Sequence, residues 1–259
     1  MDDDKMIQYH EEHHADATIA VMEVPIQEAP RFGIMNTDCD MQILEFEEKP
    51  MAPKNNLASM GIYVFRWDKL RQYLIADNTL SQSDHDFGKN IIPAMLGGNE
   101  KLYAYLFHGY WKDVGTIESL WEANMDLLKE SPELDLHDDN WRIYGRNLIK
   151  PPQYIGKNAK VQSSVVGDGC KILGEVENSI LFPSVVIEEG AVVKDSVIMP
   201  ETVIRSGSVI RKAILDEEVT IMEDASIGGD NKITVIGAEL TIPKGAEVAE
   251  GEMLYPRAK

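Results

Sequence analysis

Residues 180–210 read ILFPSVVIEEGAVVKDSVIMPETVIRSGSVI, a stretch with an apolar residue at every sixth position and a small residue four positions after most of them. A second series, one residue out of phase, continues this spacing as far as Ile233. A helix repeats every 3.6 residues and a strand every two, so neither produces a period of six. A triangular parallel β-solenoid does, because each hexad forms one side and three hexads complete a turn. The apolar positions of the first series are Ile180, Val186, Val192, Ile198, Ile204 and Ile210.

The repeat predicts a left-handed parallel β-helix of about four to five coils, with the apolar residues inside and the small residues at the corners. The left hand is taken from known hexapeptide-repeat proteins. Pro151 and Pro152 indicate a linker before it, so residues 146–259 are expected to form a linker and a β-helix domain. A β-rich sandwich with coincidental spacing is the alternative.

Many hexapeptide solenoids are acyltransferases that use a histidine as general base. The histidines of this chain are His10, His13, His14, His85, His108 and His137. None lies beyond residue 137, so packing, oligomerisation or regulation is the favoured role of the solenoid.

Residues 1–145 alternate between helical and strand patterns, which is typical of an α/β domain. The first five residues form a charge run. Strands are expected at 17–24, 32–35, 41–47, 57–65 and 101–107. Helices are expected at 3–14, 67–74, 87–96 and 116–129, the last capped by Thr116.

The composition excludes several classes of protein. The 259 residues carry 44 acidic and 25 basic side chains, a formal charge of −19, which disfavours a general nucleic-acid binder. A hydrophobic content of 44% supports a folded core, and no stretch reaches the roughly 20 apolar residues of a membrane span. The two cysteines, Cys39 and Cys170, fit a reducing cytoplasm better than a disulfide scaffold or a four-ligand zinc site.

The segment Glu45-Phe-Glu-Glu-Lys-Pro50 closes a predicted strand and carries the first candidate site residues. Pro50 is expected to hold Lys49 extended, so that its ammonium group leaves the strand end toward a sugar phosphate. Glu48 is suited to accept hydrogen bonds from sugar hydroxyls. The plainer interpretation is a solvated charge cluster.

The segment Tyr110-Trp-Lys-Asp-Val-Gly-Thr116 precedes a predicted helix. Asp113 is placed to hold Mg²⁺ against a phosphate, or alternatively serves only as a turn or capping residue. Gly115 permits close approach of a ligand to the backbone.

Three further groups of residues have both a functional and a structural interpretation. Asp86-Phe87-Gly88 lines a site or simply begins a helix, and Ser59 and Tyr63 share one face of a strand. The closely spaced histidines of residues 10–14 resemble a metal site. Their acidic neighbours favour a solvated polar helix instead.

Taken in order, these motifs resemble bacterial glucose-1-phosphate adenylyltransferase, also called ADP-glucose pyrophosphorylase, from about residue 6 to the late 230s. Two further segments carry the resemblance, 56–65 (NLASMGIYVF) and 85–93 (HDFGKNIIP), beside Arg31-Phe-Gly-Ile34. The resemblance implies a nucleotidyltransferase domain of Rossmann type followed by the β-helix. It implies ATP and glucose 1-phosphate as substrates, a role in glycogen (alpha-glucan) biosynthesis, Mg²⁺ as cofactor, and a cytoplasmic homotetramer.

The resemblance also implies roles for residues of this chain. Lys49 would bind the phosphate and Asp113 would be one of two aspartates that hold Mg²⁺. The residues that would line the glucose 1-phosphate site are Gly33, Glu48, Lys49, Ser59, Tyr63, Asp86, Phe87 and Trp111.

One departure from the family is large. Members open with a glycine-rich nucleotide loop and a later Gly-Asp-His segment, whereas before residue 97 this chain has only Gly33, Gly61 and Gly88. We therefore expect a chain that lacks the main ATP site, is inactive by itself, and depends on a partner chain or self-association because its sheet is incomplete. A non-catalytic regulatory or assembly subunit, possibly paired with a paralogous subunit, is the alternative.

Overall fold

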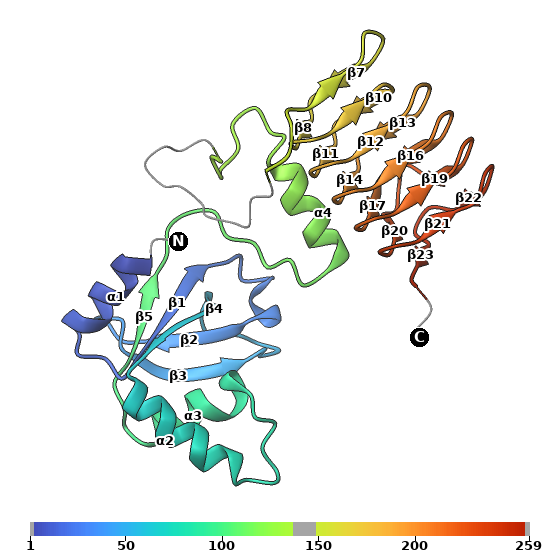
Figure 1. Ribbon diagram of the computed structural model, residues 1–259. Coiled ribbons are helices and arrows are strands. Elements are labelled where there is room, and N and C mark those ends of the chain that lie inside the picture. Colours follow the sequence, from blue (N-terminus) through green and yellow to red (C-terminus); the bar gives the residue numbers. More distant parts are fainter. Residues whose placement is uncertain (1–2, 137–148, 257–259) are drawn as a thin grey trace. The chain divides into compact units, whose positions relative to one another are not determined.

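The computed structural model describes residues 3–136 and 149–256 (Figure 1). The chain divides into two compact units, Met1–Gly109 and Tyr110–Lys259. The boundary expected at residue 145 lies outside the described residues and stays a prediction. The helix that follows Thr116 belongs to the second unit.

The first unit is built on a five-stranded sheet in the order β3-β2-β4-β1-β5. β1 pairs antiparallel with β4 and parallel with β5, while β2 and β3 form an antiparallel hairpin. This arrangement confirms the strands and the hairpin expected from the sequence. The strand bounds are Ala17–Glu23 for β1, Gly33–Thr37 for β2, Ile43–Glu48 for β3, Leu57–Phe65 for β4 and Leu102–Leu106 for β5.

Successive side chains of β1 point to opposite faces of the sheet, and helices cover both faces. Thr18 faces helix α1 (Asp3–Glu12), where its hydroxyl is hydrogen-bonded to His10 Nδ1 at 2.8 Å. Ile19 and Val21 face the other way, into a core that also contains side chains of the three helical segments after β4. These segments are α2 (Trp67–Asn78), the π-helical turn η2 (Phe87–Ile91) and α3 (Ile92–Gly97).

A bulge interrupts the pairing of β4 with β1. Ile19 pairs with Tyr63 and Val21 with Ser59, so β4 contains two more residues than β1 over this span. Gly61 lies in the bulge with a φ of 71°, a conformation that glycine adopts without steric cost. On its second edge, within the described parts of the chain, β4 pairs with β2 only through Ala58 and Ile34.

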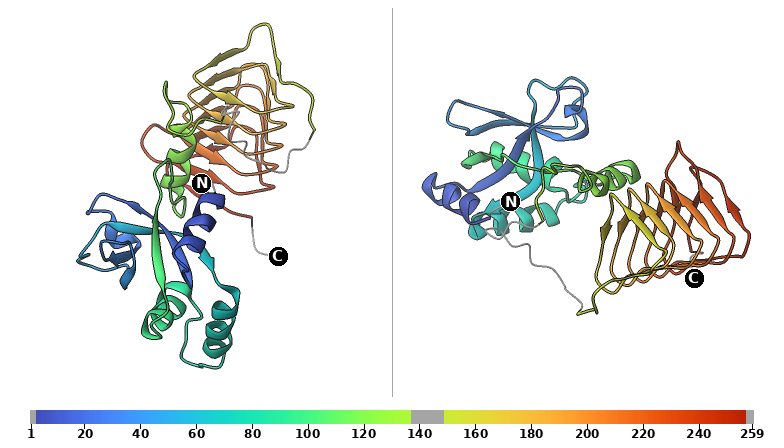
Figure 2. Two further views of the ribbon diagram at one scale, coloured as in Figure 1. Left: turned by 90° about the vertical axis from the view of Figure 1, so that its left-hand side faces the viewer. Right: turned by 90° about the horizontal axis from the view of Figure 1, so that it is seen from above.

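In the second unit, three parallel sheets of six strands each form a triangular solenoid (Figures 1 and 2). The fold is the parallel β-helix predicted from the hexapeptide repeat, but the residues that the structure describes form six coils, not four to five. The outermost strands, β6 (Tyr154–Ile155) and β23 (Met253–Leu254), lie outside the unbroken repeat, so the repeat alone undercounts the coils.

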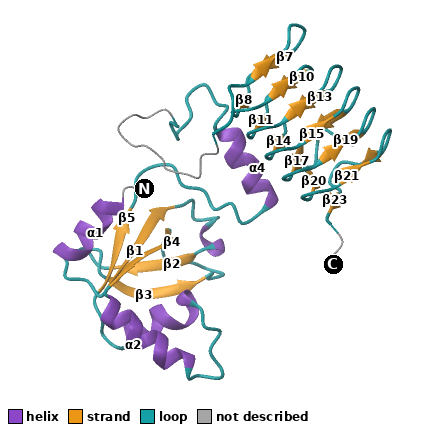
Figure 3. Cartoon of the chain, in the orientation of Figure 1, coloured by secondary structure: helices purple, strands orange, loops and turns teal. Residues whose placement is uncertain are grey.

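The strands of the solenoid are two or three residues long and are joined by loops (Figure 3). One sheet contains β7 (Lys160–Gln162), β10 (Glu175–Glu177), β13 (Val192–Lys194), β16 (Val209–Arg211), β19 (Ser226–Gly228) and β22 (Glu247–Val248). A second contains β8 (Val165–Val166), β11 (Ile180–Leu181), β14 (Val197–Ile198), β17 (Ala213–Leu215), β20 (Thr234–Ile236) and β23. The third contains β6, β9 (Lys171–Ile172), β12 (Val186–Ile187), β15 (Val203–Ile204), β18 (Thr220–Ile221) and β21 (Thr241–Ile242).

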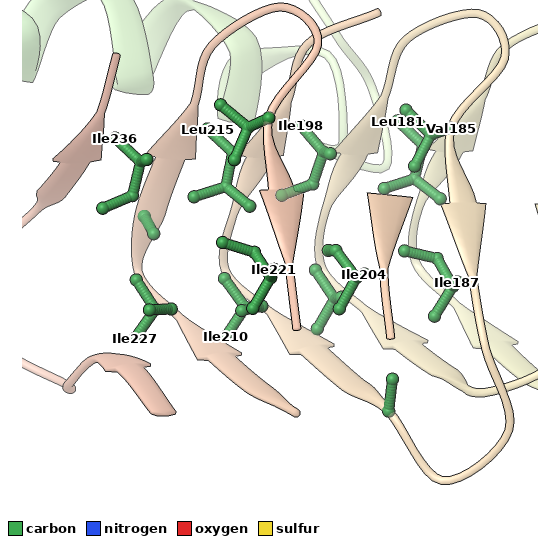
Figure 4. Packing of buried hydrophobic residues seen from close by; sticks show 14 of the residues in the cluster. Leu181, Val185, Ile187, Ile198, Ile204, Ile210, Leu215, Ile221, Ile227 and Ile236 are labelled. Atoms are coloured by element: carbon green, nitrogen blue, oxygen red, sulfur yellow. The ribbon is translucent and has the colours of Figure 1, made fainter. Parts of the chain in front are cut away.

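The interior register differs from the predicted one in part of the repeat. Ile187 lies in the solenoid core (Figure 4) and, like Val193, is fully buried, whereas Val186 and Val192 are only half-buried. Val192 pairs with Val209, one coil of 17 residues later, so one side of the coil is a residue short of the six-residue repeat. The buried interior series is Leu181, Ile187, Val193, Ile198, Ile204, Ile210, Leu215, Ile221 and Ile227. The predicted interior positions are therefore confirmed at Ile198, Ile204 and Ile210 of the first series and at Leu215, Ile221 and Ile227 of the second, and are wrong at Val186, Val192 and Ile233.

The small residues near the corners are mostly hydroxylated and satisfy buried backbone groups. Ser179 Oγ accepts from the backbone N–H of Ser196, and Ser196 Oγ accepts from that of Ala213, both at 3.1 Å. Each serine hydroxyl also donates to the carbonyl two residues earlier. These ladders keep the corner amides paired where water is excluded.

Helix α4 (Ile117–Asp126) packs along the sheet that contains β11, β14 and β17. Trp121 Nε1 donates to the carbonyl of Asp195 at 2.8 Å, and the Lys212 ammonium lies 5.4 Å from the Trp121 ring centroid. The outward residues of this sheet's middle strands, such as Val197 and Ile214, are accordingly buried. Among the residues that the structure describes, no helix is long and apolar enough to span a membrane.

Candidate functional site

The hairpin of β2 and β3 places Gly33 directly opposite Glu48. Met35 and Phe46 are the next pair on the same face, and both pack in the core beside η2 and α3. Glu45 and Glu47 lie on the opposite face, where both pair with Lys54. Of the three glutamates in the predicted cluster, only Glu48 therefore faces the candidate site.

Two glycines make room for this carboxylate. A Cβ at Gly33 would stand 2.6 Å from the Phe46 ring and 3.2 Å from Glu48 Oε2. A Cβ at Gly88 would stand 2.8 Å from the same Oε2 and 3.3 Å from Asp86 Oδ1. The backbone of both glycines thus lies against the carboxyl groups, which places Gly33, Glu48 and Asp86 together.

Asp86 forms the N-terminus of η2. Its Oδ1 accepts from the backbone N–H of Lys89 at 2.9 Å, and its own N–H donates to Asn90 Oδ1 at 3.1 Å. The predicted helix over 87–96 is present, but it begins with this π-helical turn before α3. Asp86 therefore caps the turn, and its carboxylate also lies beside Gly88 and Glu48, while its role in substrate binding stays a prediction.

Ser59 and Tyr63 lie on one face of β4, as predicted, because their partners Val21 and Ile19 share a face of β1. The Tyr63 ring stacks on Phe87 with centroids 5.8 Å apart and an interplanar angle of 17°. Burial raises the pKa of Tyr63, the hydrogen bond to Ser59 lowers it, and the Glu48 and Asp86 carboxylates raise it further. The phenol therefore lies within electrostatic reach of both carboxylates.

Lys49 follows the strand and is exposed, but its backbone differs from the expectation. The expected extended conformation is wrong, because φ is 47°. The backbone N–H of Lys49 donates to the carbonyl of Phe32 at 3.1 Å, which continues the pairing of the hairpin and closes a turn before Pro50. This turn outweighs the ordinary preference of a residue before proline.

Trp111 and Asp113 belong to the second unit, on the segment before α4. Asp113 is exposed, and its Oδ1 accepts from the backbone N–H of Gly115 at 3.0 Å. Thr116 caps α4 in a reciprocal arrangement with Ser119, as the sequence predicted for the cap. At the start of the segment, burial and a hydrogen bond to Asp126 raise the pKa of Tyr110 to about 12.

The described residues contain no group of three or more His, Cys, Asp or Glu side chains arranged to hold a metal. His10 is buried and hydrogen-bonded to Thr18, and His13 Nδ1 is hydrogen-bonded to the carbonyl of Tyr9. Helix α1 is not wholly solvated, since Met6 and His10 are buried.

The structure thus brings six of the predicted residues to one region of the first unit: Gly33, Glu48, Ser59, Tyr63, Asp86 and Phe87. Lys49 adjoins this region through Glu48. Sequence reasoning missed Phe46 and Phe65, whereas Gly88 was already part of the candidate segment 86–88. The signal for Phe46 was its position two residues before Glu48 on the same strand face. The Phe65 ring lies at a tilt against Phe87, with the ring centroids 5.7 Å apart.

Two protein families match the chain. The family described as nucleotidyl transferase matches residues 1–130, and the GlmU-like C-terminal hexapeptide family matches residues 152–242. Named glucose-1-phosphate adenylyltransferases are close relatives. That of Clostridium beijerinckii is 56% identical over 96% of this chain and 64% of its own length. The enzyme of Clostridium novyi is 60% identical over 92% of this chain and 62% of its own length. The enzyme of Desulforamulus reducens is 47% identical over 100% of this chain and 67% of its own length.

The chain therefore spans somewhat less than two thirds of the length of the first two relatives.

Proposed function

Because the chain belongs to the glucose-1-phosphate adenylyltransferase family of nucleotidyl transferases, we propose that the protein makes ADP-glucose and pyrophosphate from ATP and glucose 1-phosphate, for glycogen (alpha-glucan) biosynthesis. The observation that carries the proposal is the grouping of the Glu48 and Asp86 carboxylates beside Gly33 and Gly88, within electrostatic reach of Tyr63, whose ring stacks on Phe87. Two carboxylates and an aromatic wall are what a sugar requires: acceptors for its hydroxyls and an apolar surface for its ring.

In this function the residues of the first unit bind and orient glucose 1-phosphate. Glu48 and Asp86 accept hydrogen bonds from hydroxyls, Ser59 and Gly33 lie at the wall beside them, and Lys49 neutralises the phosphate. An oxygen of that phosphate then attacks the α-phosphorus of ATP in line, and pyrophosphate leaves. Such a transfer needs little covalent help from the protein, so positioning and charge neutralisation supply the acceleration.

For Trp111 and Asp113, on the segment of the second unit before α4, the roles in substrate and metal binding stay those that the family resemblance implies. Asp113 is one exposed carboxylate, which suits Mg²⁺, an ion commonly held by one or two carboxylates together with substrate phosphates. The described residues supply this one ligand and not a full set. When bound, the metal would stabilise the negative charge that builds up on the transferred phosphoryl group.

The ATP side of the reaction is proposed to need a nucleotide-binding segment of a type not found in these 259 residues. Before residue 97 the chain has three glycines, and none belongs to a glycine-rich loop. We accordingly expect these 259 residues alone to turn over little or no substrate. We also propose a cytoplasmic homo-oligomer, with the partly unpaired edge of β4 favouring association.

A release assay for pyrophosphate tests the function. The protein that contains this chain together with a nucleotide-binding segment is mixed with ATP, glucose 1-phosphate and Mg²⁺. The proposal predicts pyrophosphate and ADP-glucose in equal amounts, and none when glucose replaces glucose 1-phosphate. Absence of product from a folded, magnesium-supplied protein would contradict it. A non-catalytic subunit, the second candidate, would instead change the activation of a full-length partner that copurifies with it.

A further inference from the structure

The segment that presents Asp86 and Phe87 has little apolar anchorage. No residue from Leu80 to Phe87 is buried. A pocket of about 470 Å³ opens beside it, lined on the α2 side by Leu74 and Ile75 and on the η2 side by Phe87 and Ile91. Apolar packing alone therefore does not hold Asp86 and Phe87 in one position at the site.

A polar network at the end of α2 holds the segment instead. Asp77 Oδ1 accepts from Ser83 Oγ at 2.6 Å, and Asp77 Oδ2 pairs with His85 Nδ1 at 2.8 Å. Ser83 Oγ in turn accepts from the backbone N–H of His85 at 3.0 Å. The Asp77 side chain is only 12% exposed, and its bonds to Ser83 and His85 hold the pKa of this carboxyl below its ordinary value.

The network acts on a backbone turn next to the site. His85 has a φ of 55°, in the left-handed region that few residues other than glycine adopt. The following residue, Asp86, receives three backbone N–H groups: Lys89 donates to its Oδ1, and Asn90 and Ile91 donate to its carbonyl. The hydrogen bonds of His85 to Asp77 and Ser83, together with those that Asp86 accepts, can stabilise a backbone conformation at His85 that is unfavourable by itself.

We propose that Asp77, Ser83 and His85 are positioning residues that fix Asp86 and Phe87 for the sugar phosphate. The proposal rests on the proposed function, because Asp86 and Phe87 are there assigned to glucose 1-phosphate. None of the three residues need touch the ligand. Their effect reaches it through the turn at His85.

The first test is Asp77→Ala, with Asp84→Ala as the matched control. Asp84 lies on the same segment, but its partner is Lys89 and both side chains are more than half exposed. Isothermal titration of the full chain with glucose 1-phosphate gives the dissociation constant. We expect Asp77→Ala to raise it about 10-fold and Asp84→Ala to change it less than about 2-fold.

Two substitutions at His85 separate the network from simple relief of backbone strain. His85→Asn keeps an N–H donor at the position of Nδ1 and tolerates a positive φ. His85→Gly tolerates the turn but loses the donor. The proposal predicts near-normal binding for His85→Asn and a loss like that of Asp77→Ala for His85→Gly. A role limited to backbone strain would leave His85→Gly unimpaired.

Hydrogen exchange of the Lys89, Asn90 and Ile91 amides provides a reading that does not depend on the ligand. Release of Asp86 should raise their exchange rates about 10-fold in Asp77→Ala but not in Asp84→Ala. Unchanged exchange relative to the control would overturn the proposal, and so would faster exchange with unaltered sugar-phosphate binding. If the unmodified chain binds no glucose 1-phosphate, the proposed function fails, while the exchange rates still decide whether the network holds Asp86.

Discussion

Gly88→Ala should weaken sugar-phosphate binding without unfolding the protein, because the added methyl group would meet the Glu48 carboxylate. The new Cβ would stand 2.8 Å from Glu48 Oε2, closer than carbon and oxygen can approach. Glu48 is an exposed side chain, so it can move aside by a few tenths of an ångström at little cost in stability. The carboxylate then no longer lies where a sugar hydroxyl would donate to it.

The magnitude follows from the one interaction that is lost. A hydrogen bond to a charged group contributes about 1.5–3 kcal/mol, and exposure of Glu48 favours the lower end. A loss of about 1.5 kcal/mol raises the dissociation constant for glucose 1-phosphate about 10-fold, which calorimetric titration of the chain resolves. Gly97→Ala is the matched control, because a Cβ there meets nothing within 4 Å.

A double-mutant cycle shows whether the effect passes through Glu48. In a Glu48→Ala background the obstructing carboxylate is absent, so adding Gly88→Ala should change binding by less than about 2-fold. If Gly88→Ala binds as tightly as Gly97→Ala, or weakens binding equally in both backgrounds, the geometry assigned to Glu48 is wrong.

Four other predictions concern different parts of the molecule. In the active enzyme, Lys49→Ala should raise the KM for glucose 1-phosphate about 10- to 100-fold, and an unchanged KM would refute the phosphate role. Asp113→Ala should mainly lower kcat, by about 100-fold or more, whereas a pure KM effect would argue against metal binding. Ile187→Ala should lower the free energy of unfolding in urea by about 3 kcal/mol, because Ile187 lies in the solenoid core, and Val186→Ala should lower it by less than about 1 kcal/mol. Equal losses in the two variants would favour the register predicted from the sequence, in which Val186 points inward. Burial lowers the pKa of His10 from 6.5, so the unfolded chain binds the extra proton and stability falls as pH drops below 6.5. Between about pH 8 and about pH 5.5, the Tm should therefore fall less in His10→Asn than in the unmodified chain. An equal fall in Tm in the two proteins would contradict this prediction.

Much of the fold follows from local sequence patterns. The six-residue spacing predicts the solenoid because each coil repeats the same contacts, and an error of one residue at Val186 does not change the architecture. The register itself is harder to predict, because Val186 and Ile187 are both apolar. The coil that leads from Val186 to its partner Val203 has 17 residues, one fewer than three complete hexads, and this length determines that Ile187 and not Val186 lies in the core.

The sequence predicted those residues of the candidate site whose side-chain type indicates their chemistry. It did not predict the conformations and contacts that depend on residues from other segments of the fold. Glu48, Tyr63 and Asp86 come together as expected. The conformation of Lys49 did not follow from Pro50, because a hydrogen bond to Phe32 across the hairpin decides it. Gly88 and the network around Asp77 depend on contacts between segments that no single motif contains.

The most direct test of the central claim is a calorimetric titration of the unmodified chain with glucose 1-phosphate, with glucose and inorganic phosphate as comparison ligands. The account predicts saturable binding of glucose 1-phosphate, much weaker binding of either comparison ligand, and a clear loss of affinity in Lys49→Ala. No binding by the folded chain, or equal affinity for glucose and glucose 1-phosphate, would contradict the claim that these residues form a sugar-phosphate site.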